Sequence, residues 1–165
     1  MELKECNSLE NIDGLKGMRG MEFVRFDDVV NLTNIDALAG MSRMKSVVIY
    51  GSVNLKNIDA VKGMLDLECL SLWDCPKLES IECIKGLTKI KNLTIKYCEA
   101  LLNLDALQNL KMLEDLDLTG SIKLQNIDGL KSLSNLGNID LSGCESLKNV
   151  EELKKTFPNA NIVEP

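Results

Sequence analysis

A leucine column recurs along the whole chain at a constant interval of 23 residues. Its members are Leu9, Leu32, Leu55, Leu78, Leu101, Leu124 and Leu147, and no insertion interrupts the spacing. Self-similarity at a period of about 20 to 50 residues is typical of solenoids, in which each repeat buries its apolar side only against its neighbours. The chain is therefore best interpreted by columns, meaning positions that lie 23 residues apart.

Each repeat contains a short segment in which two apolar residues alternate with polar ones. From the second repeat onward the apolar pairs are Val24/Phe26, Val47/Ile49, Leu70/Leu72, Leu93/Ile95, Leu116/Leu118 and Ile139/Leu141. Alternation with a period of two predicts strands that are buried on one face only. We therefore expect the intervening polar residues to project from an open face.

An acidic column follows the leucine column. Its members are Asp13, Asp36, Asp59, Glu82, Asp105, Asp128 and Glu151, and in all but one repeat an asparagine precedes the acid by two positions (Asn11, Asn34, Asn57, Asn103, Asn126 and Asn149). Such a ladder would suit calcium, but Asp is also a preferred N-cap of helical turns, and we expect capping. An apolar spacing of three follows the acids, which favours short 3₁₀ or single-turn helices.

Four of the six cysteines share one column, which argues against a disulfide framework. These are Cys6, Cys75, Cys98 and Cys144, and the other members of the column are Val29, Ser52 and Ser121. The column therefore requires a small buried side chain rather than a thiol. A disulfide between Cys75 and Cys98 would be geometrically conceivable, but nothing in the sequence supports it. The chain has no CxxC pair and no histidine, so we expect no metal site and no cofactor.

The charge and the chain length limit the classes of function. A net charge of −6 and a pI near 4.8 oppose binding to nucleic acid or to an anionic membrane, so partners should be neutral or basic. No apolar run reaches the length of a membrane span, and residues 1–20 lack the pattern of a signal peptide. We expect one domain over residues 1–165 that is monomeric and, if the chain is complete, cytoplasmic. Residues 151–165 read as a capping helix stopped by Pro158 and followed by a short strand.

The pattern Leu-x-x-Leu-x-Leu-x-x-Cys-x-x-Leu-x-x-Ile resembles the leucine-rich repeat. The chain approximates it from Leu113 onward and again from Leu136 through Ile139, Leu141, Cys144 and Leu147. The Ile-Asp-x-Leu segments are similar to internalin repeats, and the Leu-Ser-Gly-Cys segment is similar to repeats of plant disease-resistance receptors. The resemblance implies an α/β solenoid, a horseshoe of seven 23-residue repeats. Its parallel sheet would form the concave face, and short 3₁₀ or α turns would form the convex face.

The only tryptophan and both tyrosines fall on three consecutive predicted strands. Tyr50 and Trp73 share one column, and Tyr97 follows that column by one residue, so the rings should form a patch about 10 Å across. Exposed Trp and Tyr are typical anchors of interfaces, whereas the alternative is that large side chains merely cover the sheet. The predicted partner-binding residues are Arg25, Asp27, Tyr50, Trp73, Asp74, Lys96 and Tyr97.

Catalysis is not expected of this chain. Without histidine the usual general base and the histidine triads are excluded, and an open sheet offers no closed pocket that would desolvate paired acids. The expected function is a protein interaction module that binds a protein or peptide, with basic or aromatic contact residues, on its concave face. The alternatives are a substrate-recognition fragment of a larger receptor or ubiquitin-ligase-type assembly, and a bacterial effector that binds a host protein.

Overall fold

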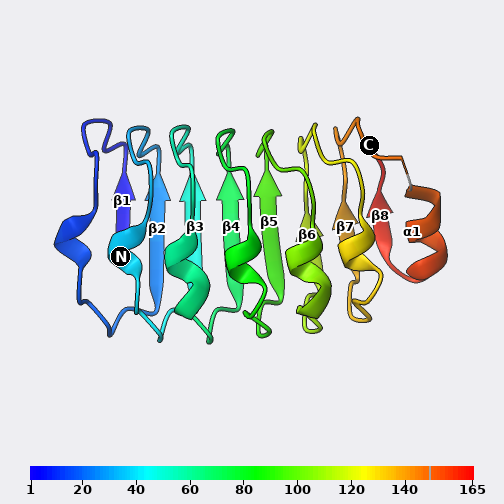
Figure 1. Ribbon diagram of the computed structural model, residues 1–165, viewed down its shortest axis with the longest axis horizontal. Coiled ribbons are helices and arrows are strands. Elements are labelled where there is room, and N and C mark those ends of the chain that lie inside the picture. Colours follow the sequence, from blue (N-terminus) through cyan, green and yellow to red (C-terminus); the bar gives the residue numbers. More distant parts are fainter. Residues whose placement is uncertain (149) are drawn as a thin grey trace.

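The alternating segments of the sequence form the strands of one parallel sheet, in which the spatial order of the strands equals their order in the chain. The computed structural model describes residues 1–148 and 150–165. The strands are β1 (Glu2–Lys4), β2 (Phe23–Asp27), β3 (Ser46–Tyr50), β4 (Cys69–Trp73), β5 (Asn92–Lys96), β6 (Asp115–Asp117), β7 (Asn138–Asp140) and β8 (Asn161–Val163). Figure 1 shows them side by side along the long axis, with the helical turns on one side of the sheet.

The register between neighbouring strands reproduces the repeat interval. Val24 pairs with Val47, and Val47 pairs with Leu70, so each strand is displaced from the next by one 23-residue repeat. The inward pairs lie beneath the sheet with exposed fractions of at most 2%. Leu32 through Leu124 of the leucine column are equally buried, whereas Leu9 and Leu147, in the terminal repeats, are only partly buried. The predicted solenoid is therefore confirmed, and β8 adds an eighth strand to the seven implied by the repeats.

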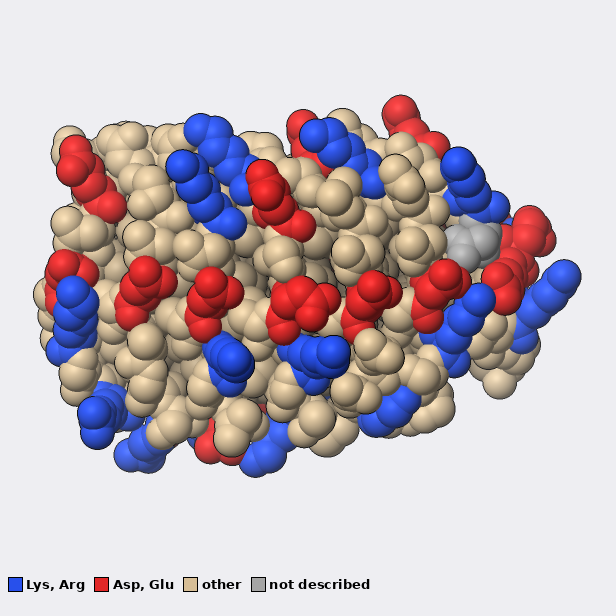
Figure 2. Space-filling view, in the orientation of Figure 1, with Lys and Arg blue, Asp and Glu red and all other residues tan. Residues whose placement is uncertain are grey.

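In the described part of the chain, six 3₁₀ turns connect each strand from β1 to β6 with the next one. They are η1 (Asp13–Leu15), η2 (Asp36–Leu38), η3 (Asp59–Gly63), η4 (Glu82–Ile84), η5 (Asp105–Asn109) and η6 (Asp128–Leu130). The predicted short 3₁₀ turns are confirmed. Each turn begins with a member of the acidic column, and Figure 2 shows acidic side chains in a row along this face of the molecule.

The prediction that the acids are the N-caps is wrong. Each acid is the first residue of its turn, and the residue before it, such as Ile12 or Ile35, provides no capping side chain. The asparagine two positions before the acid has this role instead, because its Oδ1 accepts the backbone N–H of the acid at 3.0–3.3 Å. An asparagine side chain that satisfies the backbone two residues on closes an Asx turn. Ser80 substitutes for asparagine before Glu82, at 3.2 Å.

The cysteine column lies in the core as a small-residue column. Cys75, Cys98, Cys144, Ser52 and Ser121 are fully buried, and all six cysteines of the chain are free thiols. A hydrogen bond with Cys98, together with burial, raises the pKa of Cys75, and burial raises the pKa of Cys144 to about 11. These thiols are therefore protonated at neutral pH, which suits packing rather than nucleophilic chemistry.

The last repeat ends in a helix, α1 (Val150–Thr156), followed by strand β8. Two acids lie in the first turn of α1 and two lysines in its last turn, as the helix dipole favours. Leu153 and Phe157 are buried, and β8 pairs with β7, so this segment covers the end of the core. Asn149, the last member of the asparagine column, lies outside the described residues. Among residues 1–148 and 150–165, no helix has the length and apolarity needed to cross a membrane.

Candidate functional site

The candidate site lies on the open sheet face, which we define as the face of the sheet opposite the buried pairs. Alternation along each strand places Arg25 and Asp27 of β2 on this face, and the register aligns Asp27 with Tyr50, Trp73 and Lys96 on the next three strands. The side chains on this face come from straight, hydrogen-bonded strands, so their spacing is set by the sheet rather than by flexible loops.

In each of the seven repeats, the residue that follows the column of Asp27, Tyr50, Trp73 and Lys96 adopts a left-handed backbone conformation. Its φ is 51–56° at Glu5, Asp28, Asp74 and Tyr97, and 66–73° at Gly51, Gly120 and Gly143. Glycine adopts this conformation without strain and Asp tolerates it, whereas it is uncommon for an aromatic residue. Tyr97 therefore stands out in this column, because its side chain is held at a backbone position that costs about 1–3 kcal/mol.

Tyr50, Trp73 and Tyr97 form one continuous aromatic patch. The Tyr50 and Trp73 rings meet edge to face, with centroids 5.1 Å apart and an interplanar angle of 86°. The rings of Trp73 and Tyr97 stack with centroids 6.5 Å apart and an interplanar angle of 30°. Trp73 is 41% exposed and Tyr97 is 44% exposed. The patch thus presents large apolar surfaces to solvent in a fixed mutual arrangement.

The absence of a side chain at Gly120 makes room for the ring of Tyr97. A Cβ atom at Gly120 would overlap Cδ1 of Tyr97, so the ring lies directly against the backbone of the next repeat. The left-handed conformation of Tyr97 and the glycine beside it together hold the ring on the sheet instead of leaving it free in solvent.

A groove of about 540 Å³ borders the patch on its N-terminal side. Tyr50 and Trp73 form one wall, and the side chains of β1 and β2 with the residues that follow them form the other. Asp27 accepts a hydrogen bond from Nε of Arg25 through Oδ2 at 2.8 Å, and this bond raises the pKa of Arg25. The other carboxylate oxygen, Oδ1, is buried without a hydrogen-bond partner. The groove is therefore apolar on one side and charged on the other.

The structure brings together most of the predicted site residues. Arg25, Asp27, Tyr50 and Trp73 all line the groove. Lys96 lies beyond Trp73, with Nζ 5.4 Å from the ring centroid. Tyr97 lies on the same side of the tryptophan as Lys96, and Asp74 lies at the end of β4 outside the groove.

Sequence reasoning missed Lys4 and Glu5, which line the groove from β1 and the residue after it. The signal was present, since both lie 23 residues before Asp27 and Asp28.

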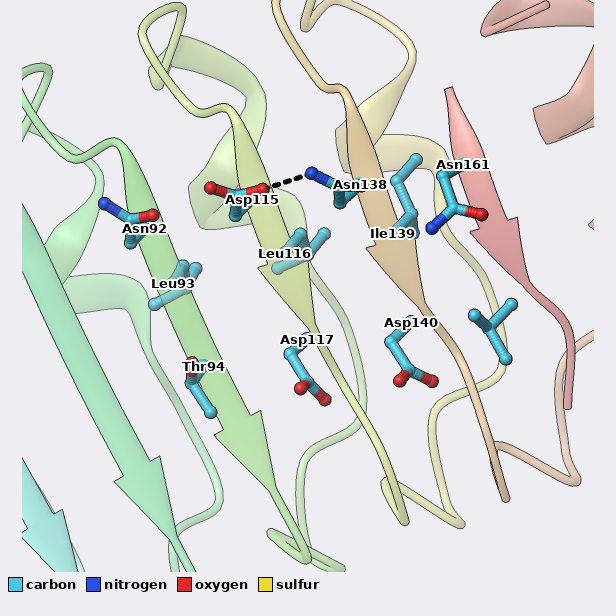
Figure 3. A pocket seen from close by; sticks show the side chains of 11 residues that line it. Asn92, Leu93, Thr94, Asp115, Leu116, Asp117, Asn138, Ile139, Asp140 and Asn161 are labelled. Atoms are coloured by element: carbon cyan, nitrogen blue, oxygen red, sulfur yellow. Dashed lines mark hydrogen bonds between the residues drawn. The ribbon is translucent and has the colours of Figure 1, made fainter. Parts of the chain in front are cut away.

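A second hollow of about 360 Å³ lies toward the other end of the open sheet face. We call its carboxylates Asp115, Asp117 and Asp140 the acidic end. Figure 3 shows Asp117 and Asp140 on adjacent strands and the hydrogen bond from Nδ2 of Asn138 to Oδ1 of Asp115, which is 2.6 Å long. The amide row that borders these acids (Asn92, Asn138 and Asn161) comes from the residue just before each inward pair, a position that the sequence analysis did not consider.

The carboxylates of the acidic end are hydrogen-bonded within the chain. Asp117 accepts hydrogen bonds from the backbone N–H and the side chain of Thr119. It also forms an ion pair with Lys96 at 2.7 Å, and the hydrogen bond between these two side chains raises the pKa of Lys96. Asp140 accepts two hydrogen bonds from Ser142. Partial burial by itself would raise the pKa of Asp140. The hydrogen bonds from Ser142 and the charge of Lys96 outweigh this effect, so the pKa lies below its ordinary value.

A metal role finds no support in the arrangement of the acids. Within the described ranges, no group of three or more cysteine, aspartate and glutamate side chains is placed to hold a metal ion.

Comparisons with known proteins agree with this fold. The sequence profile of the BspA type Leucine rich repeat region matches the chain in six copies, over residues 2–119 and 69–159. The leucine-rich repeat domain of the type III effector XopL has a similar structure, with a TM-score of 0.76 at 21% identity, covering 100% of this chain and 68% of that chain. No curated protein sequence matches.

Two internalins of Listeria monocytogenes share the fold more distantly. Internalin C2 has a TM-score of 0.60 at 19% identity, covering 88% of this chain and 62% of its own. For internalin F the TM-score is 0.58 at 15% identity, with 95% of this chain and 58% of that chain covered. At these identities the likeness concerns the fold, and this chain spans about three fifths of either internalin. Because the family profile covers nearly the whole sequence, the chain belongs to the BspA-type leucine-rich repeat family, a class of solenoid domains that generally serve as protein interaction modules.

Proposed function

We propose that this domain binds an extended segment of a partner protein on its open sheet face and that the aromatic patch is the anchor of the interface. The observation that supports this proposal is the contact geometry of Tyr50, Trp73 and Tyr97, which are packed against one another and yet leave Trp73 and Tyr97 more than 40% exposed. Trp and Tyr at the centre of a surface are the residue types that most often dominate binding energy.

The groove beside the patch supports an extended segment rather than a flat protein surface. Its volume of about 540 Å³ is enough for several side chains but small for a protein domain. Because the rings are held by the sheet and by the backbone at Gly120, little side-chain freedom is lost on binding. A rigid aromatic anchor beside a groove is therefore suited to a peptide-like ligand.

Selection from a library of random twelve-residue peptides tests the proposal. The selected peptides should lose about 30-fold or more in affinity for the Trp73→Ala variant, because truncation of a central aromatic anchor costs about 2 kcal/mol or more. The thermal unfolding midpoint of the variant should stay nearly unchanged, since Trp73 projects from the sheet and is not part of the core.

The control variant is Ser142→Ala, which lies in the same column as Trp73 but three strands away. Its affinity for the selected peptides should match that of the wild type. Peptides that bind wild type and Trp73→Ala equally, or a library that yields no binder, would contradict the proposal. A parallel loss of affinity and folding in Trp73→Ala would show that the tryptophan covers the sheet instead of anchoring a partner.

A further inference from the structure

The groove combines an aromatic corner with carboxylates that lack a counter-charge. Tyr50 and Trp73 meet at nearly a right angle, so the edge of one ring and the face of the other bound the same space. The faces of aromatic rings attract cations, most strongly at tryptophan. This corner therefore favours a positively charged group over a neutral one.

The cations of the groove are already engaged within the chain. Arg25 bonds Asp27 at 2.8 Å, and Lys4 lies 3.1 Å from Glu2 and 4.0 Å from Asp27. Among the described residues, the carboxylates of Glu5 and Asp28 form no ion pair, although both line the groove. The free charge of the groove is consequently negative.

The other side of Trp73 shows that its ring can accept a cation. Lys96 of β5 places Nζ 5.4 Å from the ring centroid, while Tyr50 lies on the opposite neighbour strand, β3. Among the described residues, Lys96 is the one cation that lies over the Trp73 ring, and it comes from the β5 side. On the β3 side, the groove is lined by Tyr50 and Trp73.

We propose that the groove binds an arginine side chain of the partner segment, with its guanidinium against Tyr50 and Trp73 and its N–H groups directed to the Asp28 and Glu5 carboxylates. This inference rests on the proposed peptide binding and adds the chemistry of the anchor. A guanidinium fits better than an ammonium because it is planar, stacks on aromatic rings and donates in a fork that matches a carboxylate. The acidic net charge of the domain adds long-range attraction for a basic segment.

A set of four peptides tests the inference directly. They share the sequence acetyl-Gly-Ser-Leu-X-Leu-Ser-Gly-amide, where X is arginine, lysine, citrulline or norleucine. Trp73 is the only tryptophan of the protein, so its fluorescence reports occupation of the groove without a label. The arginine peptide should bind about tenfold more tightly than the citrulline peptide, which has nearly the same shape without the charge.

Two matched variants locate the contact. Asp28→Asn removes a groove carboxylate at a left-handed position that asparagine tolerates, so it should lower the affinity of the arginine peptide about tenfold and leave the citrulline peptide unchanged. Asp36→Asn removes the same charge from the 3₁₀ turn η2 on the other side of the sheet, and the arginine peptide should lose less than about twofold.

Four outcomes would overturn the inference. Equal affinity for the citrulline or norleucine peptide would assign the groove to neutral or apolar groups, and equal affinity for the lysine peptide would refute the preference for a guanidinium. Identical effects of Asp28→Asn and Asp36→Asn would mean that only overall charge matters. If none of the four peptides binds while library-selected peptides still require Trp73, the arginine assignment fails and the proposed function stands.

Discussion

The two ends of the open sheet face rest on the same core but differ in how far their polar groups are satisfied. At the acidic end, Asp115 accepts a hydrogen bond from Asn138 of β7, and Asp117 and Asp140 accept hydrogen bonds from Thr119 and Ser142 in the turns that follow their strands. At the other end, Trp73 and Tyr97 are exposed, and Glu5 and Asp28 form no ion pair with any residue that the structure describes. A surface that has satisfied its own hydrogen bonds gains less from a partner than one that has not. This difference is the reason to place the binding site at the aromatic patch.

The repeat explains how one chain can hold both surfaces. Inward columns are buried in the same way in every repeat, so they stay apolar or small: most members are leucine, isoleucine or valine, and Phe26 is an aromatic exception. Outward columns have no such constraint, and their members can change chemistry from strand to strand. The inward columns therefore form a scaffold that all repeats share, whereas the outward columns form a surface that differs from strand to strand.

Removing one core leucine from each half tests whether the scaffold is shared. Leu55→Ala and Leu124→Ala should each lower the free energy of unfolding by about 2–5 kcal/mol, because both side chains are fully buried and occupy the same column. Urea unfolding followed by circular dichroism measures both values. A large loss for one variant and a negligible loss for the other would show that the two halves are not equivalent scaffolds.

Two glycine variants separate backbone strain from the packing of Tyr97. Gly120→Ala and Gly143→Ala both place a Cβ on a left-handed residue, but only the Cβ at residue 120 would overlap the Tyr97 ring. We expect a loss of about 1 kcal/mol for Gly143→Ala and about 2–3 kcal/mol for Gly120→Ala. Equal losses, measured by thermal unfolding, would mean that the ring moves aside without cost.

Lys96 connects the two ends, because it pairs with Asp117 and lies over Trp73. Lys96→Met should lower stability by about 0.5–1 kcal/mol, since both interactions are partly exposed to solvent. It should also shift the Trp73 emission, whereas Asp117→Asn should leave the cation over the ring and alter emission less. A larger emission change in Asp117→Asn would contradict the assigned position of Lys96.

The smallest effect concerns acid sensitivity at the acidic end. Because the pKa of Asp140 is lowered in the folded protein, the unfolded chain binds more protons, and the contribution of Asp140 to stability is lost as the pH falls below the ordinary value of 3.8. Between pH 5 and pH 2.5, the free energy of unfolding should therefore fall less steeply in Asp140→Asn than in the wild type. Identical slopes would show that Asp140 is not stabilised as a carboxylate.

The fold could be predicted from the sequence because the same positions are apolar in each of the seven repeats. The inward pairs and the leucine column each follow from burial alone, and the register follows from their interval. The capping of the turns could not be assigned in this way. Asp and Asn both accept backbone N–H bonds, so only the position of the turn relative to each residue distinguishes them.

The candidate site could be predicted only in part. Alternation places Tyr50 and Trp73 on the open face, but it does not show that Tyr97 has a left-handed backbone or that its ring lies against Gly120. The sequence pattern also does not show which carboxylates form ion pairs and which do not. Asp28 and Asp117 look alike in the sequence, and their difference depends on whether a cation of a neighbouring strand reaches them.

Backbone amide chemical shifts of the isotope-labelled protein, recorded with and without a library-selected peptide, test the central claim most directly. If the partner binds at the aromatic patch, the largest shifts should fall on β2 to β5 and include Tyr50, Trp73 and Tyr97. The residues of β6 and β7 should change little, because their carboxylates already accept hydrogen bonds from this chain. Shifts concentrated at Asp115, Asp117 and Asp140, with the aromatic patch unaffected, would contradict the account.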